Sequence, residues 1–261
     1  MNRPGTFRPT AASESVSGFS RTLAILRAFP LATAAIVVAG GPTTAIGSQS
    51  GNSPPVVRIT RPADTQVLQW GAPFRYAITV SDREDGESAS GEIPPHQIVL
   101  EVEYRRPAEL DARSRRADEP AGLKVMRTST CFTCHADKIS LVGPSFSAIA
   151  ERYGNDLETL RRLAGHIRSG SSGLWGSLAM PPHSHLSEDE ALAAARFIVA
   201  QGSQRNRWVY AGVEGVIRIV DKPADGTAGT YTLIASYLDN GIGGVPDTRA
   251  RGEHSVTFVM K

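Results

Sequence analysis

Hydrophobic and polar residues alternate along two segments in the first half of the chain. The positions expected to face a core are Phe74, Tyr76, Ile78 and Val80 in the first segment, and Ile98, Leu100, Val102 and Tyr104 in the second. A period of two predicts half-buried β-strands, because successive side chains of a strand point to opposite faces. A shorter strand is expected around Val57 and Ile59, and residues 82–86 (DREDG) are expected to form a turn.

The alternation stops near residue 107, and helical spacing continues to about residue 205 before strand patterns return. The later strands are indicated by Ile217 and Ile219, by Tyr231, Leu233, Ala235 and Tyr237, and by Val256 and Phe258. Each group of strands is too small to close a sandwich alone, whereas together they approach the seven or so strands of an immunoglobulin-like fold.

We therefore predict a protein of two domains, one all-α and one all-β. The all-α domain (117–205) would be inserted between the two halves of an immunoglobulin-like β-sandwich (48–116 and 206–261). Such an insertion requires the two ends of the inserted domain to lie close together. The charged stretch 109–119 is expected to be a solvated linker or a short helix.

The first 47 residues have the pattern of a secretory signal peptide. A positively charged lead precedes an apolar run at 28–40 (AFPLATAAIVVAG), and small residues follow it. This run is shorter than the roughly 20 apolar residues that span a bilayer, and no later segment is apolar enough to be a span. The leader could also stay attached as an anchor. In both cases we expect the remainder of the chain to be periplasmic or secreted.

The charge balance argues against a nucleic-acid partner. The whole chain carries 28 Lys and Arg against 26 Asp and Glu, a net charge of +2. Four arginines and one glutamate place three net positive charges in the leader, which leaves −1 for the rest of the chain. A nucleic-acid-binding protein would need a basic face, and this balance does not provide one.

The motif that carries chemistry is Cys131-Phe132-Thr133-Cys134-His135. This spacing is the attachment signature of c-type haem. Two thiols must reach the two vinyl groups on one edge of the porphyrin while the adjacent imidazole binds the iron, and a helical turn places all three side chains for this task. We therefore expect one covalently attached haem c.

Two cysteines at this spacing also occur in three other kinds of site. A thioredoxin-like pair belongs to a βαβ unit, and no parallel-sheet pattern surrounds this one. A structural zinc site needs four ligands, commonly two cysteine pairs, whereas the chain has only two cysteines. A disulfide is compatible with an oxidising compartment but leaves His135 unexplained.

A second axial ligand to the iron is expected downstream, and methionine is the ligand expected in an electron carrier. Of the four methionines, Met1 lies in the leader, Met126 directly precedes the motif and Met260 is next to the C-terminus. Met180 remains, in a loop that Pro181 and Pro182 stiffen. A lone methionine can also simply fill space in a core, but the place of Met180 in this loop favours a role as iron ligand. His135 and Met180 are thus the expected metal ligands.

Residues 122–201 resemble the small bacterial monohaem class I cytochromes c. The resemblance rests on CFTCH, on LVGP at 141–144 followed by a helix over 146–153, on GLWG at 173–176, on MPP at 180–182 and on a last helix that begins at Ser187. Ser187 and Glu190 form a capping box at the start of that helix. Pro144 would offer its carbonyl to the ring N–H of His135, which leaves the other ring nitrogen for iron.

The resemblance also implies roles around the haem propionates and the methionine sulfur. Trp175 resembles the family tryptophan that hydrogen-bonds a propionate, although a loop tryptophan can equally be simple packing. His166 stands where these cytochromes often carry an arginine near a propionate. His183 stands where an asparagine often hydrogen-bonds the methionine sulfur, and either histidine could add pH dependence to the redox potential.

The two strand regions resemble the PKD-type, immunoglobulin-like modules found beside secreted sugar dehydrogenases of the glucose/sorbosone class. The resemblance implies docking or adhesion rather than chemistry. Trp70, Trp208 and Tyr210 could stack on sugars, although strand aromatics are more often core residues.

Three functions follow from these features. The first is an electron-transfer protein, not an enzyme, that passes single electrons from an exported sugar or quinoprotein dehydrogenase to a cytochrome or oxidase of the respiratory chain. The second is a peroxidase-type haem enzyme with Met180 displaced and His183 or His185 as acid and base, which would need an open iron site. The third is a carbohydrate-binding or adhesive module that carries a cytochrome.

Overall fold

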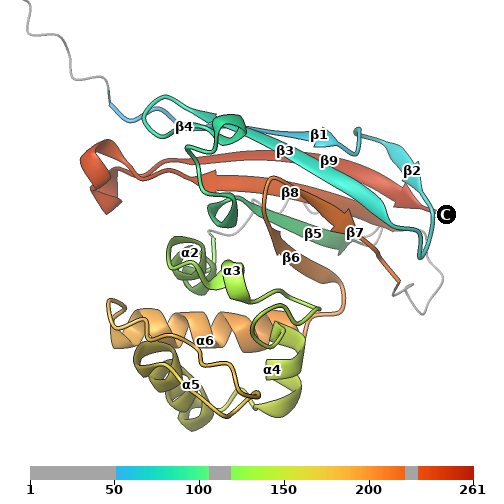
Figure 1. Cartoon of the computed structure of the whole chain (residues 1–261). Helices are drawn as coiled ribbons and strands as arrows, with labels where there is room; N and C mark the ends of the chain where they lie inside the picture. Colours follow the sequence, from blue (N-terminus) through green and yellow to red (C-terminus); the bar gives the residue numbers. More distant parts are fainter. Residues whose placement is uncertain (1–50, 106–118, 221–228) are drawn as a thin grey trace, which may run out of the picture. The chain divides into compact units, whose positions relative to one another are not determined.

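The computed structural model describes residues 51–105, 119–220 and 229–261 (Figure 1). The predicted signal peptide and residues 109–118 of the charged stretch lie outside the described residues.

The strands form two sheets, and each sheet takes strands from both sides of the helical region. In the first sheet β1 (Val56–Arg61), β3 (Phe74–Asp82) and β4 (Gly86–Glu87) follow one another, and β7 (Glu214–Ile217) also pairs with β3. The second sheet has the order β2 (Gln66–Leu68), β9 (Arg251–Met260), β8 (Thr230–Leu238), β5 (Val99–Arg105) and β6 (Arg207–Ala211). All pairs are antiparallel except β2 with β9. Short 3₁₀ turns lie at Ser88–Ser90, Pro95–Gln97, Ile242–Gly244 and Pro246–Thr248.

The two sheets share one hydrophobic core. The predicted inward positions supply it, among them Tyr76, Ile78 and Val80 from the first sheet and Leu100, Leu233 and Phe258 from the second. The Tyr231 and Phe258 rings stack with centroids 5.5 Å apart. The predicted DREDG turn is present, and the Asp82 carboxylate accepts from the backbone N–H groups of Glu84 and Asp85.

Three aromatic residues, Trp70, Trp208 and Tyr210, bear on the carbohydrate hypothesis. Trp208 is buried in the shared core, and Trp70 and Tyr210 pack against it. The Trp70 and Tyr231 rings meet edge to face at 5.8 Å. The expectation that Trp208 could stack on a sugar is therefore wrong, because the protein already covers its ring.

The helical region contains five helices, counted over the described residues. They are α2 (Ala121–Thr128), α3 (Cys131–Cys134), α4 (Phe146–Arg152), α5 (Leu157–Ser169) and α6 (Glu188–Gly202). Side chains of Ser145, Asp156 and Ser187 cap α4, α5 and α6 by accepting from backbone N–H groups in the first turn. The capping box of Ser187 and Glu190 is confirmed. Among the described residues, no helix is long and apolar enough to cross a membrane.

The helical region begins and ends on two paired strands. It follows β5 and precedes β6 (Figure 1). These strands run antiparallel, with Glu103 opposite Arg207. The last residues of β5 and the first of β6 therefore lie side by side, which is the arrangement that an inserted segment requires.

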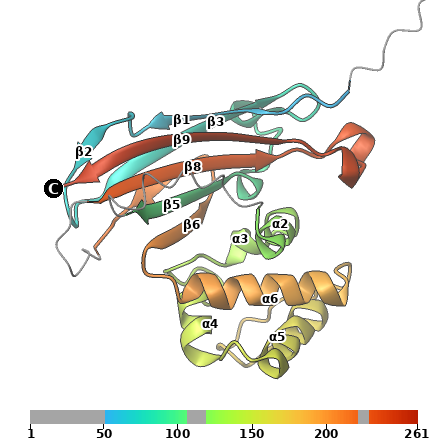
Figure 2. The ribbon, with the colours of Figure 1, turned by 180° about the vertical axis from the view of Figure 1, so that it is seen from behind.

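Strand β5 differs from the prediction because the first half of its outer face is also buried. Leu100 and Val102 face the core between the sheets, whereas Val99, on the other face, is fully buried in the helical core together with Val209 of β6. The prediction of a half-buried strand was wrong for Val99 and Glu101 on the outer face, whereas Glu103 and Arg105 farther along the same face stay partly exposed. The helices lie beside the sheet that contains β5 and β6 (Figure 2).

Candidate functional site

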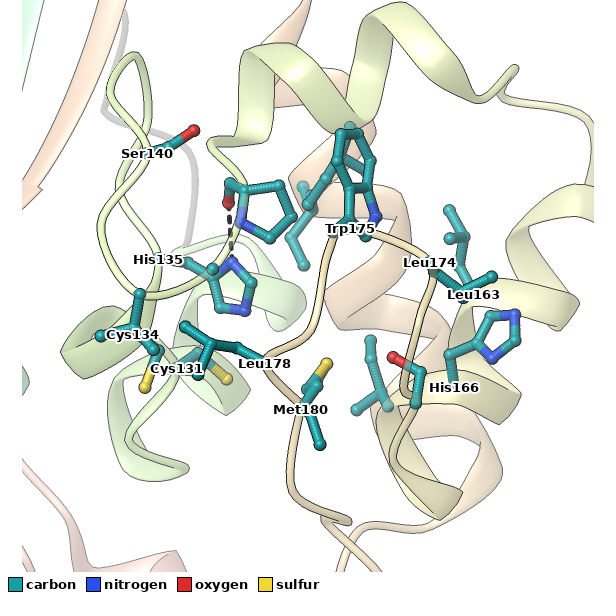
Figure 3. Close-up of a pocket in the computed structure, with 18 of the residues that line it drawn as sticks. Cys131, Cys134, His135, Ser140, Leu163, His166, Leu174, Trp175, Leu178 and Met180 are labelled. Atoms are coloured by element: carbon teal, nitrogen blue, oxygen red, sulfur yellow. Dashed lines mark hydrogen bonds between the residues drawn. The ribbon is translucent and has the colours of Figure 1, made fainter.

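A cavity of about 560 Å³ lies within the helical region. Its walls come from all five helices of this region and from the loops that follow α3 and α5, and most of the residues that line it are apolar. Figure 3 shows His135 and the sulfur atoms of Cys131, Cys134 and Met180 around this one space. The structure thus brings together four side chains that are separated by up to about 50 positions in the sequence.

The two cysteines occupy a single helical turn. Helix α3 is only four residues long and begins after Thr130, whose φ of 60° is in the left-handed region. Both thiols are free, so the structure holds no disulfide between them. Burial raises the pKa of the Cys131 thiol to about 11. A thioredoxin-type cysteine needs a lowered pKa, and this environment does the opposite.

His135 follows the turn directly, and its ring is fixed from two sides. Its Nδ1 lies 2.7 Å from the carbonyl oxygen of Pro144, so Nδ1–H donates to this oxygen and Nε2 remains for a metal. A Cβ on Gly143 would lie 2.4 Å from His135 Cε1, so only glycine leaves room for the ring here. The structure places the Pro144 carbonyl where the resemblance implied.

Met180 ends a loop whose base is closed by two hydrogen bonds. Ser171 N donates to Met180 O at 3.1 Å, and Met180 N donates to Ser171 O at 2.8 Å. The Met180 side chain is partly buried against the helical core and lines the cavity. Met126, which the sequence did not favour as a ligand, also lines the cavity, but it is fully buried in α2 as part of the core.

The remaining predicted residues divide into two groups. Trp175 and His166 line the cavity, whereas His183 is not among its lining residues. The backbone N–H of His183 donates to Ile167 O, and its ring centroid lies 5.8 Å from that of His185. Partial burial, together with the neighbouring His185 and His135, lowers the pKa of His183 and favours its neutral form.

Two residues of the site were not found from the sequence. Arg152 and Tyr153 lie at the end of α4, where the Arg152 side chain contacts the loop that leads to Met180, and Tyr153 lines the cavity. Nothing in the local pattern ERYG distinguishes these residues from any charged helix end, so only the structure identifies them.

The residues present fit a covalently attached haem. Two thiols on one helical turn, an imidazole with Nδ1 engaged and a thioether face one apolar cavity, and this is the donor set of a His/Met haem c. Over the described residues there is no group of three or more His, Cys, Asp or Glu side chains that could hold a bare metal ion.

Comparison with known proteins agrees with this donor set. Cytochrome c-552 of Nitrosomonas europaea is 35% identical over 79 residues, which are 30% of this chain and 77% of the relative. Cytochrome c-551 of Azotobacter vinelandii is 37% identical over 78 residues, or 30% of this chain and 94% of the relative. The chain belongs to the family of small c-type cytochromes.

The similarity covers less than a third of the chain. The crystal structure of wild-type Nitrosomonas europaea cytochrome c552 matches this chain with 35% sequence identity and a TM-score of 0.29. The match covers 30% of this chain and 96% of the chain in that structure. A search with protein-family models found no match. About 70% of the chain lies beyond what these relatives span.

Proposed function

We propose that the chain is an exported cytochrome c that transfers single electrons through one haem. Cys131 and Cys134 would attach the haem, and His135 and Met180 would bind its iron. The observation that carries this proposal is the cavity in which these four side chains meet, with His135 Nδ1 held 2.7 Å from the Pro144 carbonyl.

When bound, the haem supplies a one-electron couple between the two oxidation states of iron. The protein's own residues set the conditions for that couple. Pro144 and Gly143 fix the orientation of the His135 ring, and the thioether of Met180 favours the reduced iron relative to an imidazole ligand. Phe146, Ile149 and Ile167 exclude water from the cavity wall, which limits reorganisation around the iron.

The rim of the cavity is the surface that we propose for redox partners. Leu141, Val142 and Leu178 line the cavity and are 50%, 60% and 67% exposed, and Leu174 and Trp175 lie beside them. Residues 118–203 carry 8 Lys and Arg against 9 Asp and Glu, so strong charge steering is not expected. A small apolar contact of this kind suits a transient redox encounter.

For the whole chain we propose that the two sheets form an immunoglobulin-like sandwich, with the cytochrome inserted between β5 and β6. The sandwich would dock the cytochrome to an exported sugar or quinoprotein dehydrogenase as the electron donor, and a cytochrome or oxidase of the respiratory chain would be the acceptor. The resemblance of the strand regions and the paired ends of the insertion support this arrangement.

The covalent bonds provide the first test of this function. Haem should stay with the denatured polypeptide of the exported protein, because thioether bonds survive where coordination does not. In Cys131→Ala or Cys134→Ala one bond is lost, and in the double variant acid-acetone should extract all haem. Met180→Ala is the matched control and should retain covalent haem. Complete extraction from the unaltered protein would refute the proposal.

A further inference from the structure

Helix α4 connects the two sides of the candidate iron site. At its beginning, the carbonyl of Pro144 accepts from His135 and the side chain of Ser145 caps the helix. At its end, Arg152 reaches the loop that carries Met180. One seven-residue helix therefore contacts the elements that hold both proposed ligands.

The Arg152 side chain makes one hydrogen bond and two cation–π contacts. Its Nη1 donates to the carbonyl oxygen of Leu174 at 2.6 Å, and its guanidinium carbon lies 4.7 Å from the centroid of the Trp175 ring. The same carbon lies 5.6 Å from the Tyr153 ring, and the Tyr153 and Trp175 rings meet edge to face at 6.3 Å. Guanidinium over aromatic faces is a favourable arrangement, and tryptophan is the best partner for it.

The loop that Arg152 contacts has few other attachments. Its base is closed by the two hydrogen bonds between Ser171 and Met180. Within the described part of the chain, the bond from Arg152 to Leu174 is the one hydrogen bond that residues 172–179 make. Gly173 and Gly176 add backbone freedom, and Leu178 is 67% exposed.

We propose that Arg152 is a positioning residue that keeps the Met180 loop closed over the cavity. It touches neither the thiols nor the imidazole, and it acts on Met180 only through Leu174 and Trp175. This inference rests on the proposed function, since it concerns the stability of the Met180 bond to iron. Loss of Arg152 removes a charge-assisted hydrogen bond and a cation–π contact, so the open form of the loop should become about tenfold more populated.

The test is the binding of imidazole to the oxidised holoprotein, because imidazole competes with Met180 for the iron. Arg152→Ala should bind imidazole about tenfold more tightly than the unaltered protein. Arg152→Lys, which keeps the charge and a donor but not the planar stack, should lie between the two. Arg161→Ala removes an exposed arginine of α5 and should bind imidazole as the unaltered protein does.

Two further measurements separate this role from general destabilisation. In Arg152→Ala the weak thioether-to-iron charge-transfer band should disappear at a lower imidazole concentration than in the unaltered protein, and the urea midpoint should fall by no more than the loss of this one contact accounts for. Equal imidazole affinities in Arg152→Ala and the unaltered protein would overturn the proposal, and so would equal increases in Arg152→Ala and Arg161→Ala. A missing thioether band in the unaltered protein would instead refute the proposed function.

Discussion

At the scale of single residues, two methionines line one cavity but have different surroundings. Met126 is fully buried in α2, whereas Met180 is partly buried on a loop that ends at the cavity. The fixed core position of Met126 suits packing, and the loop position of Met180 suits a ligand that faces His135.

Replacing Met180 with alanine should therefore open a coordination position on the iron. We expect the charge-transfer band of the Fe(III)–thioether bond to vanish, and the redox potential to fall as water or a nearby histidine binds. Met126→Leu is the control and should keep both the band and the potential. Survival of the band in Met180→Ala would assign the thioether to another residue.

Gly143 offers a second prediction, on the other side of the iron. In Gly143→Ala the new Cβ would lie 2.4 Å from His135 Cε1, so the ring must move away from the Pro144 carbonyl. We expect a smaller fraction of protein with attached, low-spin haem, measured as haem absorbance per polypeptide. Gly165→Ala is the matched control, because a Cβ at this helical position meets nothing within 4 Å. It should leave the haem content unchanged and stabilise α5 by about 0.5–1 kcal/mol.

Most of the candidate site was accessible from the sequence because its chemistry is local. Cys131, Cys134 and His135 fall within one five-residue motif, and Pro144 and Met180 lie in short proline-containing segments. Arg152 and Tyr153 were missed because their role depends on where α4 ends relative to a distant loop. The spacing of residues along the chain does not contain that information.

At the scale of elements, α6 shows how a local signal sets a helix start. Ser187 Oγ accepts from Glu190 N, and the Glu190 carboxylate accepts from Ser187 N at 2.8 Å. Two hydrogen bonds hold the pKa of Glu190 below its usual value. The larger effect comes from the backbone N–H of Ser187 and the smaller one from the Ser187 hydroxyl.

Because this pKa is lowered, the free energy of unfolding depends on pH. The unfolded chain binds the Glu190 proton more readily than the folded protein does. The stabilisation that the ionised Glu190 carboxylate gives the folded state is therefore complete above the ordinary glutamate pKa of about 4.5, and it is lost as pH falls through the lowered pKa. Glu190→Gln should remove part of the acid-induced loss of unfolding free energy, on the order of 0.5 kcal/mol because the side chain is exposed. Asp189→Asn, in the same turn but outside the capping box, should change this pH profile less. Urea titrations between pH 3 and 7 would measure both.

Other elements were harder to predict. Helix α5 has apolar residues at Leu160, Leu163, Ala164 and Ile167 and a capping Asp156, so its signal was present although we did not single it out. Strand β2 is three residues long and pairs in parallel with β9 at the other end of the chain. So short a strand has no period to detect, and its partner is fixed only by the tertiary fold.

At the scale of the described molecule, Arg127 joins the helices to the second sheet. It is fully buried in α2, where Nη2 donates to Ser236 Oγ at 2.9 Å and the guanidinium pairs with Glu119. Asp137, two residues after His135, accepts from Val209 N of β6 and from Gln201 of α6, both at 3.0 Å. Polar contacts as well as Val99 and Val209 therefore hold the cytochrome against the sheet.

Removing Arg127 should destabilise the protein strongly. Arg127→Ala leaves the buried Glu119 carboxylate without its ion-pair partner, and breaking such a pair typically costs about 3–5 kcal/mol. Arg196→Ala, on the exposed side of α6, should cost less than about 0.5 kcal/mol. Urea unfolding monitored by haem absorbance and by tryptophan fluorescence would compare them. Equal stabilities would show that this contact does not bind the two parts together.

The sequence indicated a helical region between two groups of strands, but not how the helices contact the sheet. Val99, Val209 and Ser236 occupy positions that alternation assigns to solvent. Their burial follows from the packing of two cores against one another. A binary pattern specifies only one core per strand, so this contact could not be predicted.

The pairing of β5 with β6 also has a kinetic consequence. About one hundred residues separate these neighbouring strands, and closing a loop of this length costs about 3–4 kcal/mol more entropy than closing a two-residue hairpin. A cytochrome region that has already collapsed around its haem presents its two ends as a short bridge and removes most of that cost. Delivery of the cofactor would then set the order of folding, with the second sheet completed only after the haem is in place. A chain starved of haem should accumulate with unpaired strand edges, and such chains are prone to aggregation and proteolysis.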